Sequence, residues 1–541
     1  MTTTTPRPTT TSDDGPPPTP TPAQATTDPT TDTTAAPAAG AGPVLRHLKV
    51  AVIGTGFSGL GTAIRLLQTG TDDFLVFERA DDLGGTWRDN TYPGCACDVQ
   101  AHLYSFSFAR NPHWKSTFAT QTEVHDYLRD CAHKHGVLPY LRYNHELLTA
   151  HWNDTHHHWD LNTTGGRYTT QFLITGTGYL STPAIPDIPG IHTFTGTLFH
   201  SAQWNHHHNL TGRTIAVIGT GASAIQFLPH IQPQAARLDL YQRTPPWIAA
   251  KPDKPNTPRH TWMLQHLPGY QQFRRNFNKH GREIIAFFMS RPTRTTAMKN
   301  MATTHLKKSV PDPHLRTLLT PDYTIGCKRL LFSNTWYPAI QQPNVNIITT
   351  PIKNIGPTHI TTTDGTTRHI DTIILATGFT PTNQPITHRI HNANGTTLNQ
   401  TWTQHGIQAH RGTTIHGYPN LFMLLGPNTT LGHSSQTVII EAQITYIIQA
   451  LKTTTTHNIT SLHPRHQAQT HYNTKLQHKL KNTVWNTGNC HSWYHDTHGN
   501  NPTIWPTYTH TYRKQTNHFD HTNYQTTTTQ NTTHNTHNTH N

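Results

Sequence analysis

Two glycine-rich turns, each set between an apolar strand and a helix, constrain the fold of this chain more than any other feature. In the first, the apolar run Leu48–Ile53 leads directly into Gly54, Gly56 and Gly59, and a helix can follow. A run without alternation is typical of a parallel strand buried on both faces. Glycines at this GxGxxG spacing permit a tight turn and the close approach of a pyrophosphate to the helix N-terminus. The stretch therefore predicts a dinucleotide-binding βαβ unit.

The second turn follows the apolar strand at 214–218 and has the form GxGxxA; its residues include Gly219, Thr220, Gly221, Ser223 and Ala224. The two units differ in the charged residue that ends their next strand. Glu78 stands 22 residues after Gly56, and Arg243, followed by Thr244, stands 22 residues after Gly221. A bare ribose hydroxyl requires an acceptor, whereas a 2′-phosphate requires a cation. We therefore expect FAD at the first unit and NADPH at the second, with a solvated strand end as the alternative for Arg243.

Strands that end in glycine bracket the second unit, at 172–178 and again at 373–378. One such strand is common, but the pair predicts that the chain leaves the first domain and later returns to it. The expected fold class is α/β, with two Rossmann-like dinucleotide-binding domains. The expected segments are an FAD-binding part at 43–180, an NADPH-binding domain at 181–372 with a helical insertion at about 251–321, and a second FAD-binding part at 373–514.

Composition separates the two ends from the folded part. Hydrophobic residues make up only 33% of the 541 residues, and the Thr/Pro-rich stretch 1–42 and the Asn/Thr/His-rich stretch 515–541 hold few of them. Such segments bury too little apolar surface to offset the entropy of the chain. We expect both to be disordered tails.

Charge and cysteine content exclude several classes of partner. The formal net charge of +13 comes from Lys and Arg that are scattered and form no dense basic stripe, so we expect no nucleic-acid partner. The 44 His show no regular ligand spacing, and we expect no metal site. Five cysteines are too sparse for a disulfide framework and indicate a reducing compartment. Since the longest apolar runs are interrupted by polar residues, we expect a cytoplasmic protein without a membrane span.

A longer motif follows the second strand of the first domain. It begins at Gly84, includes Thr86 and Trp87, ends at Asp98, and has the form GGxWxxxxYPGxxxD. The two glycines let the backbone approach a ring system, and the indole covers that ring. An enzyme that uses only a nicotinamide cofactor does not need such a segment. The alternative for Asp98 is a loop cap or an ordinary surface acid.

A second motif links the two domains. It places Phe194, Gly196, His200 and Trp204 in the pattern FxGxxxHxxxW. Together the two motifs resemble the fingerprints of type I Baeyer–Villiger monooxygenases, which use FAD, NADPH and O2 to insert one oxygen atom beside a ketone carbonyl. Relatives that oxidise nitrogen or sulfur usually carry Tyr in place of Trp204. The family commonly has Pro or Asp where this chain has Asn205.

The resemblance, which covers about residues 45–514, implies roles for individual residues. Arg329, in the Gly-Cys-Lys-Arg segment, is implied as the essential arginine and Asp98 as the residue that orients it, although many relatives have Pro in place of Leu330. Lys328 is implied as a second contact for the NADPH phosphate. His200 and Trp204 are expected to set the geometry of the linker and to transfer no proton. The residues implied at the flavin are Thr86, Trp87, Asp98, Tyr104 and Gln436.

The implied chemistry explains why the site needs a fixed cation. A peroxide carried on the flavin attacks a carbonyl only while it is deprotonated, and a guanidinium that does not titrate stabilises that anion in a dry site. The expected function is the NADPH- and O2-dependent conversion of a ketone into an ester or lactone. The alternatives are a sister enzyme that oxygenates nitrogen or sulfur, and a flavin-binding paralogue that has lost catalysis. Neither the particular ketone nor the oligomeric state follows from the sequence.

Overall fold

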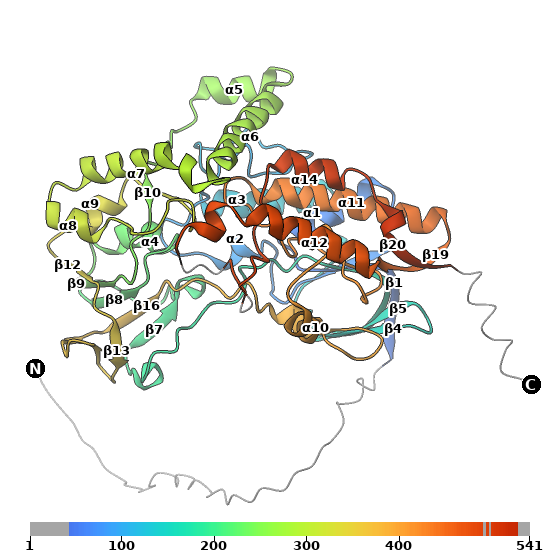
Figure 1. The fold of residues 1–541 in the computed structure, drawn as a ribbon, viewed down its shortest axis with the longest axis horizontal. Helices are drawn as coiled ribbons and strands as arrows, with labels where there is room; N and C mark the ends of the chain where they lie inside the picture. Colours follow the sequence, from blue (N-terminus) through green and yellow to red (C-terminus); the bar gives the residue numbers. More distant parts are fainter. Residues whose placement is uncertain (1–42, 491–493, 497–498, 529–541) are drawn as a thin grey trace, which may run out of the picture. The chain divides into compact units, whose positions relative to one another are not determined.

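The computed structural model describes residues 43–490, 494–496 and 499–528. The first glycine-rich turn belongs to an eight-stranded sheet with the order β17-β4-β5-β6-β1-β2-β3, in which β18 also pairs with β6 (Figure 1). Its strands are β1 (Val44–Ile53), β2 (Phe74–Phe77), β3 (Leu141–Arg142), β4 (Leu147–Asn153), β5 (His158–Thr163), β6 (Gly166–Thr175), β17 (Ile390–His391) and β18 (Leu421–Met423). Strands β1, β2, β6 and β18 run parallel. Their carboxyl ends therefore meet at one edge of the sheet, where ligands of such folds bind.

The second turn belongs to a five-stranded sheet with the order β12-β9-β8-β16-β7, in which every pair is parallel. Its strands are β7 (Thr197–His200), β8 (Thr214–Ile218), β9 (Arg237–Tyr241), β12 (Val345–Ile348) and β16 (Thr372–Leu375). The expected α/β fold with two Rossmann-like units is confirmed. Strand β16 pairs with β8 and β7, so the segment that we expected to return to the first domain from residue 373 first completes the second sheet.

Three further sheets lie within the described residues: β10 (Ile248–Ala249) with β11 (Leu331–Phe332), β13 (Ile352–Ile355) with β14 (His359–Thr362) and β15 (Thr367–His369), and β19 (Ile459–Pro464) with β20 (Tyr524–Thr528). The helices are α1 (Phe57–Gln68), α2 (Thr86–Asp89), α3 (Gln121–Lys134), α4 (Ala224–Ile231), α5 (Pro258–His266), α6 (Tyr270–Met289), α7 (Thr296–Ser309), α8 (Pro313–Leu318), α9 (Trp336–Ile340), α10 (Leu398–His405), α11 (Gln436–Thr456), α12 (His466–Leu480), α13 (Val484–Thr487) and α14 (Thr509–Thr516). Helix α1 begins at Phe57, directly after Gly56, and α4 begins at Ala224, the last residue of the second fingerprint, so a helix follows each turn as the fingerprints predict.

The two segments that connect the sheets run side by side. The backbone amide of Ala184 donates to the carbonyl of Gly378 at 2.8 Å, and that of Thr380 donates to Thr182 at 3.1 Å. The hydroxyl of Thr377 also donates to the carbonyl of Ala184. The outgoing and the returning linker are therefore held to each other by hydrogen bonds.

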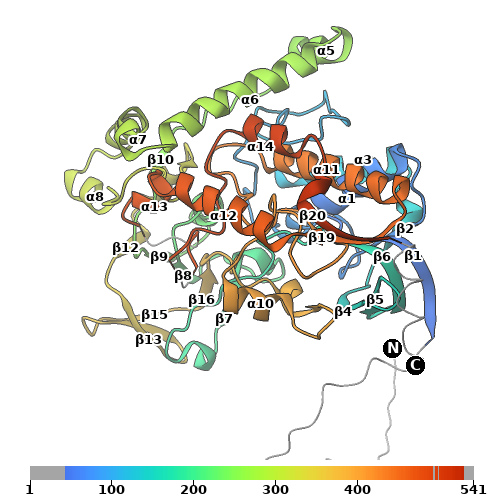
Figure 2. The same ribbon diagram turned by 45° about the vertical axis from the view of Figure 1, so that its right-hand side comes forward.

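The expected helical insertion is present as α5, α6, α7 and α8. Helix α5 and the beginning of α6 extend beyond the neighbouring elements in both views (Figures 1 and 2). Among the described residues, no helix is both long enough and apolar enough to cross a membrane.

The prediction of a disordered C-terminal tail is wrong for residues 515–528, because helix α14 continues to Thr516 and β20 pairs with β19. Asp520 fixes this segment to the core. Its carboxylate accepts from Arg411 at 2.9 Å, lies 3.1 Å from the His410 ring, and accepts from the hydroxyl of Tyr446. The low apolar content of the segment hides this anchoring, because a single carboxylate and two aromatic residues, Phe519 and Tyr524, which pack in the hydrophobic core, hold it. Residues 1–42 and 529–541, the remainder of the two expected tails, lie outside the described residues.

Asp520→Asn is expected to lower the free energy of unfolding by about 2 kcal/mol near neutral pH, because charge-assisted hydrogen bonds are lost. Burial would raise the pKa of Asp520, but His410, Tyr446 and Arg411 outweigh burial and hold it well below the usual carboxyl range. With a depressed folded pKa, the stabilisation is complete above the unfolded value of about 4 and is lost as the pH falls through the folded value. Urea unfolding at neutral and acidic pH should show a difference between variant and parent that shrinks with acid. A difference that is independent of pH would contradict the ion-pair explanation.

Candidate active site

A cavity of about 420 Å³ opens at the carboxyl edge of the eight-stranded sheet. The ends of β1, β2 and β6 border it through Ile53, Glu78 and Gly176. The predicted residues that line it are Gly54, Gly56, Glu78, Thr86, Trp87, Asp98, Tyr104, Arg329 and Gln436. The fold therefore gathers, around one cavity, residues that lie as far as 382 positions apart in the sequence.

The first turn has the shape of a phosphate cradle. Gly54 has a φ of +97°, and a Cβ at Gly59 would lie 1.7 Å from the carbonyl oxygen of Gly54, so neither position accepts a side chain. At Gly56 the space is open, and the nearest atom to an added Cβ would be the Gly85 Cα at 3.8 Å. Glu78 is buried and accepts from the backbone amide and hydroxyl of Thr55 at 3.0 and 2.6 Å.

Gly56→Ala is expected to leave the fold intact and to weaken FAD binding by about tenfold or more, because the methyl group enters space that only a ligand would fill. Retention of FAD during gel filtration, with the thermal midpoint of the cofactor-free protein as a control, measures both effects. An alanine variant with unchanged FAD affinity would show that the pyrophosphate does not approach this glycine.

Asp98 and Arg329 form a bidentate ion pair at the cavity. The guanidinium donates from Nε to Oδ2 at 2.6 Å and from Nη2 to Oδ1 at 2.7 Å. Burial would raise the pKa of Asp98, but the charge and hydrogen bonds of Arg329, together with Arg282, lower it. The carboxylate in turn raises the pKa of Arg329 above its ordinary value. Both side chains are therefore charged near neutral pH, and they are 37% exposed for Arg329 and 27% exposed for Asp98 in the lining of the cavity.

Aromatic residues wall the cavity. The Trp87 indole donates to the Tyr104 hydroxyl at 3.2 Å, and the two rings meet edge to face. The Gln436 side-chain amide, at the start of α11, lies 3.0 Å from the hydroxyl of Tyr179. Tyr179 and Tyr494 also line the cavity, although no sequence signal singled out Tyr179. The lining thus combines aromatic rings with polar and charged side chains, which could bind both the ring system and the polar groups of a cofactor.

The second turn lies outside this cavity, apart from Ala222. Gly219 has a φ of +108°, and a Cβ there would lie 2.5 Å from the carbonyl oxygen of Ala376. The Thr220 hydroxyl donates to the carbonyl of Thr244 at 3.1 Å, beyond β9. Gly221 is exposed, and Ser223 and Ala224 begin α4.

The two predicted phosphate contacts lie close enough to influence each other. Burial and then the positive charge of Arg243 lower the pKa of Lys328. The Lys328 ammonium lies 4.9 Å from the centre of the Tyr323 ring, and Arg243 is exposed. Two neighbouring cations at the end of a fingerprint strand suit a phosphate group.

Known monooxygenases match most of the chain in sequence. The sequence matches the flavin-binding monooxygenase-like family over residues 47–392. A protein named Baeyer–Villiger monooxygenase from Streptomyces coelicolor is 43% identical over 487 residues, which cover 89% of this chain and 93% of that protein. One of the same name from Pseudomonas aeruginosa is 45% identical over 487 residues, which cover 89% and 92%.

The chain belongs to the Baeyer–Villiger monooxygenase family. Its fold is similar to the crystal structure of cyclohexanone monooxygenase from Rhodococcus sp. Phi1 bound to NADP+, with a TM-score of 0.79 at 24% identity, over 90% of this chain and 100% of that one.

The residues of the second motif, FxGxxxHxxxW, lie near the linkers and, unlike those of the first motif, do not line the cavity. His200 ends β7, is buried, and meets the ring of Phe379 in the returning linker edge to face. Trp204 packs against Phe199 and Phe227 with ring centres 5.2 Å apart in each case. Phe194 packs against the core on the outer side of the second sheet, and a Cβ at Gly196 would lie 2.5 Å from the Asp371 carbonyl oxygen. This placement is compatible with a role in linker geometry, which stays a prediction.

Two buried arginines of the insertion hold the loop that carries Asp98, and the sequence interpretation missed both. Arg282 donates to the Asp98 carbonyl oxygen at 2.9 Å and to the Gln100 side chain at 3.0 Å. Arg275, two turns earlier on the same face of α6, donates to the carbonyls of His102, Leu103 and Ser105 at 2.7–3.2 Å. Their spacing of seven residues, which places two cations on one helix face, is the signal that was available in the sequence.

His433 is a second residue that the motifs did not indicate. It precedes α11, is buried, and has its pKa lowered to about 3 by burial and by the charges of Arg282 and Arg329. The ring is therefore neutral and adds no charge to the site.

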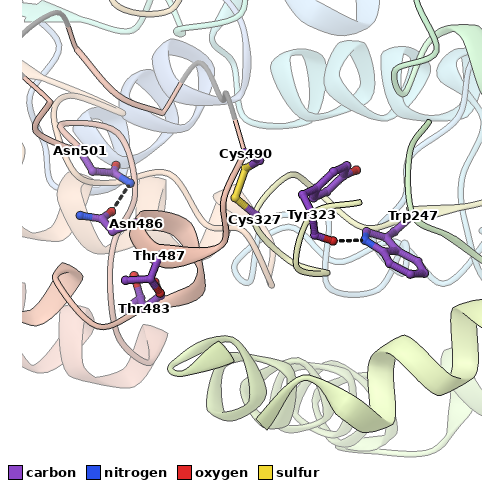
Figure 3. Close-up of a disulfide and its surroundings, with 8 residues drawn as sticks. All are labelled: Trp247, Tyr323, Cys327, Thr483, Asn486, Thr487, Cys490 and Asn501. Carbon is purple, nitrogen blue, oxygen red and sulfur yellow. Dashed lines mark hydrogen bonds between the residues drawn. A yellow bond between two sulfur atoms is a disulfide. The ribbon is translucent and has the colours of Figure 1, made fainter. Parts of the chain in front are cut away.

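A disulfide, which the sequence interpretation did not expect, joins Cys327 to Cys490 with a Cα separation of 6.2 Å (Figure 3). The bridge ties the segment of Lys328 and Arg329 to the residues that follow α13, where the Thr324 amide also donates to the Gly488 carbonyl at 3.0 Å. Its partners lie 163 positions apart, so only the tertiary fold reveals them. Cys95, Cys97 and Cys131 are free.

Proposed function

We propose that this protein uses FAD, NADPH and O2 to convert a ketone into an ester or lactone. The observation that carries the proposal is the bidentate Asp98–Arg329 pair in the lining of a cavity of about 420 Å³ that several aromatic residues border. Membership of the Baeyer–Villiger family and two relatives above 40% identity support it. The guanidinium of this pair is a fixed cation that can stabilise a developing anion.

The residues present fit FAD. The glycine turn leaves open space at Gly56, and Glu78 at the end of β2 supplies the acceptor for a ribose hydroxyl. Trp87, Tyr104 and Gln436 would surround the ring system. Bound FAD, once reduced by NADPH, supplies the activated oxygen derived from O2.

The chain's own residues then provide a fixed charge and a dry space. Arg329 keeps its proton at all working pH values, so it stabilises negative charge that develops beside the substrate carbonyl. Asp98 fixes the guanidinium plane through two hydrogen bonds and cannot take its proton. Trp87, Tyr104 and Tyr494 exclude water from that space, which strengthens the electrostatic interaction.

NADPH is proposed to bind at the second turn, with its 2′-phosphate between Arg243 and Lys328. Arg243→Ala should raise the KM for NADPH by about tenfold and leave the KM for NADH unchanged, because only NADPH carries the 2′-phosphate. Steady-state oxidation of the two nucleotides measures the ratio. An equal rise for both would place Arg243 away from the phosphate.

The decisive test is product analysis with purified, FAD-loaded protein, NADPH and air. Cyclic, linear, aromatic and steroid ketones are offered with a thioether, and esters or lactones are the expected products. Sulfoxide as the sole product would favour the heteroatom-oxygenating alternative. NADPH consumption that yields only hydrogen peroxide from every compound would contradict the proposal for these substrate classes.

The protein is also proposed to be cytoplasmic, and the use of NADPH supports this location. The Cys327–Cys490 bridge argues against it, because disulfides are rare in reducing compartments. Alkylation of intact cells before lysis, followed by mass spectrometry of the peptide containing Cys327, shows whether the two cysteines are reduced, as a cytoplasmic location requires, or bridged. Neither a nucleic-acid partner nor a metal is part of the proposed function.

A further inference from the structure

The helical insertion exposes a group of large apolar side chains. Twelve large hydrophobic residues of the described chain are exposed, and seven of them lie between residues 262 and 301. The apolar face is the set Phe273, Phe277, Ile284 and Phe287 of α6, each 44–62% exposed, and the other three exposed residues of the insertion are Trp262, Leu267 and Met301. Single exposed apolar residues are ordinary, but a concentration of this kind marks a surface that binds a partner.

Helix α6 has two distinct sides. Phe273, Phe277, Ile284 and Phe287 follow one side at helical spacing, whereas Arg275 and Arg282 lie on the other and are buried. Helix α5 and the start of α6 extend away from the sheets in both views (Figures 1 and 2). The exposed side is thus available, while the buried side holds the Asp98 loop.

Positive charge is concentrated in the same segment. Residues 251–321 hold 13 of the 41 Lys and Arg but only three of the 28 Asp and Glu. The expectation that Lys and Arg are scattered along the chain is therefore wrong for residues 251–321, because the count over the whole chain conceals this local excess. The guanidinium carbons of Arg274 and Arg294 lie 6.0 and 4.3 Å from the ring centres of Phe277 and Phe287. Basic groups accordingly flank the apolar face.

We propose that the apolar face binds the surface of an anionic membrane, with α6 lying in the plane of the interface. Trp, Phe and Leu side chains beside Lys and Arg are the composition of helices that lie at a bilayer surface. The aromatic rings would enter the boundary between headgroups and acyl chains, and the basic side chains would reach the lipid phosphates.

A second copy of the chain fits this face less well. In a symmetric dimer the same patch meets itself, so the basic groups around one apolar face would oppose those around the other. An anionic lipid surface satisfies the apolar and the basic groups together. The charge excess therefore favours the membrane over self-association.

Vesicle flotation of the full-length, FAD-loaded protein tests the proposal. Binding is expected to vesicles of equal parts phosphatidylcholine and phosphatidylglycerol, with little binding to phosphatidylcholine alone and a decrease in high salt. The triple variant Phe273→Ser, Phe277→Ser, Ile284→Ser should bind about 100-fold more weakly or worse. Its thermal midpoint should be unchanged, since these side chains are already exposed.

Matched controls separate this surface from general effects. Leu148→Ser with Ile185→Ser removes two exposed apolar residues elsewhere and should leave vesicle binding unchanged. Arg291→Glu with Lys299→Glu should weaken binding, whereas Lys475→Glu with Lys479→Glu, exposed on α12, changes the same net charge and should not. Equal binding to both kinds of vesicle, or full binding by the serine variant, would overturn the proposal. So would light scattering that shows a dimer broken by the serine variant, with no vesicle binding by the parent.

Discussion

Arg329→Ala is expected to lower the rate of ester formation by about 100-fold or more, while FAD remains bound and is still bleached by NADPH. The side chain is a fixed cation whose loss removes about 3–4 kcal/mol of stabilisation from negative charge that develops at the substrate. Its pKa is raised by Asp98, so no change of pH within the working range imitates its removal. Rapid-mixing measurement of flavin bleaching, beside chromatographic measurement of the ester, separates the two steps.

Arg329→Lys is the matched control. Lysine keeps the charge but cannot reproduce the two parallel hydrogen bonds to Asp98, at 2.6 and 2.7 Å. We expect an activity between those of the parent and the alanine variant, and a larger share of NADPH consumed without ester. Ester formation by the alanine variant at the parental rate would remove Arg329 from the reaction.

The sequence was sufficient for the parallel strands beside the two glycine-rich turns, because their signals are local. A run such as Leu48–Ile53 is apolar throughout because parallel strands are buried on both faces, and the glycine that follows is required by backbone geometry. The start of α11 is also fixed locally, because the Ser435 hydroxyl accepts from the Thr437 amide at 3.3 Å. The family resemblance pointed to Asp98 and Arg329, and the structure brings them into contact.

What the sequence did not reveal depends on contacts between distant residues. The anchoring of the C-terminus needs Asp520 to meet His410 and Arg411, which lie more than 100 positions earlier. Pairing of Cys327 with Cys490 likewise follows no spacing rule. Buried cations on a helix such as α6 resemble solvated ones in sequence, because the backbone carbonyls that accept from them belong to another segment.

Arg282→Met is expected to reduce ester formation by about 100-fold. Arg282 is only 8% exposed and donates to the Asp98 carbonyl and to Gln100, so its removal leaves buried acceptors without partners at a cost of about 3 kcal/mol. We assign it a positioning role, since its contacts are with the Asp98 loop. Flavin bleaching by NADPH should be little affected, and hydrogen peroxide formed per NADPH should rise.

The pH profile distinguishes positioning from a general loss of structure. Arg282 is one of the charges that lower the pKa of Asp98, so its replacement should raise that pKa and move the acidic limb of ester formation to higher pH. Arg282→Lys retains the charge and should restore part of the activity and the original acidic limb. If Arg282→Met instead lowers flavin bleaching and ester formation equally, with a matching fall in thermal midpoint, the arginine only supports the fold. A shifted acidic limb with intact bleaching would show that the inserted helix acts on the reaction through Asp98.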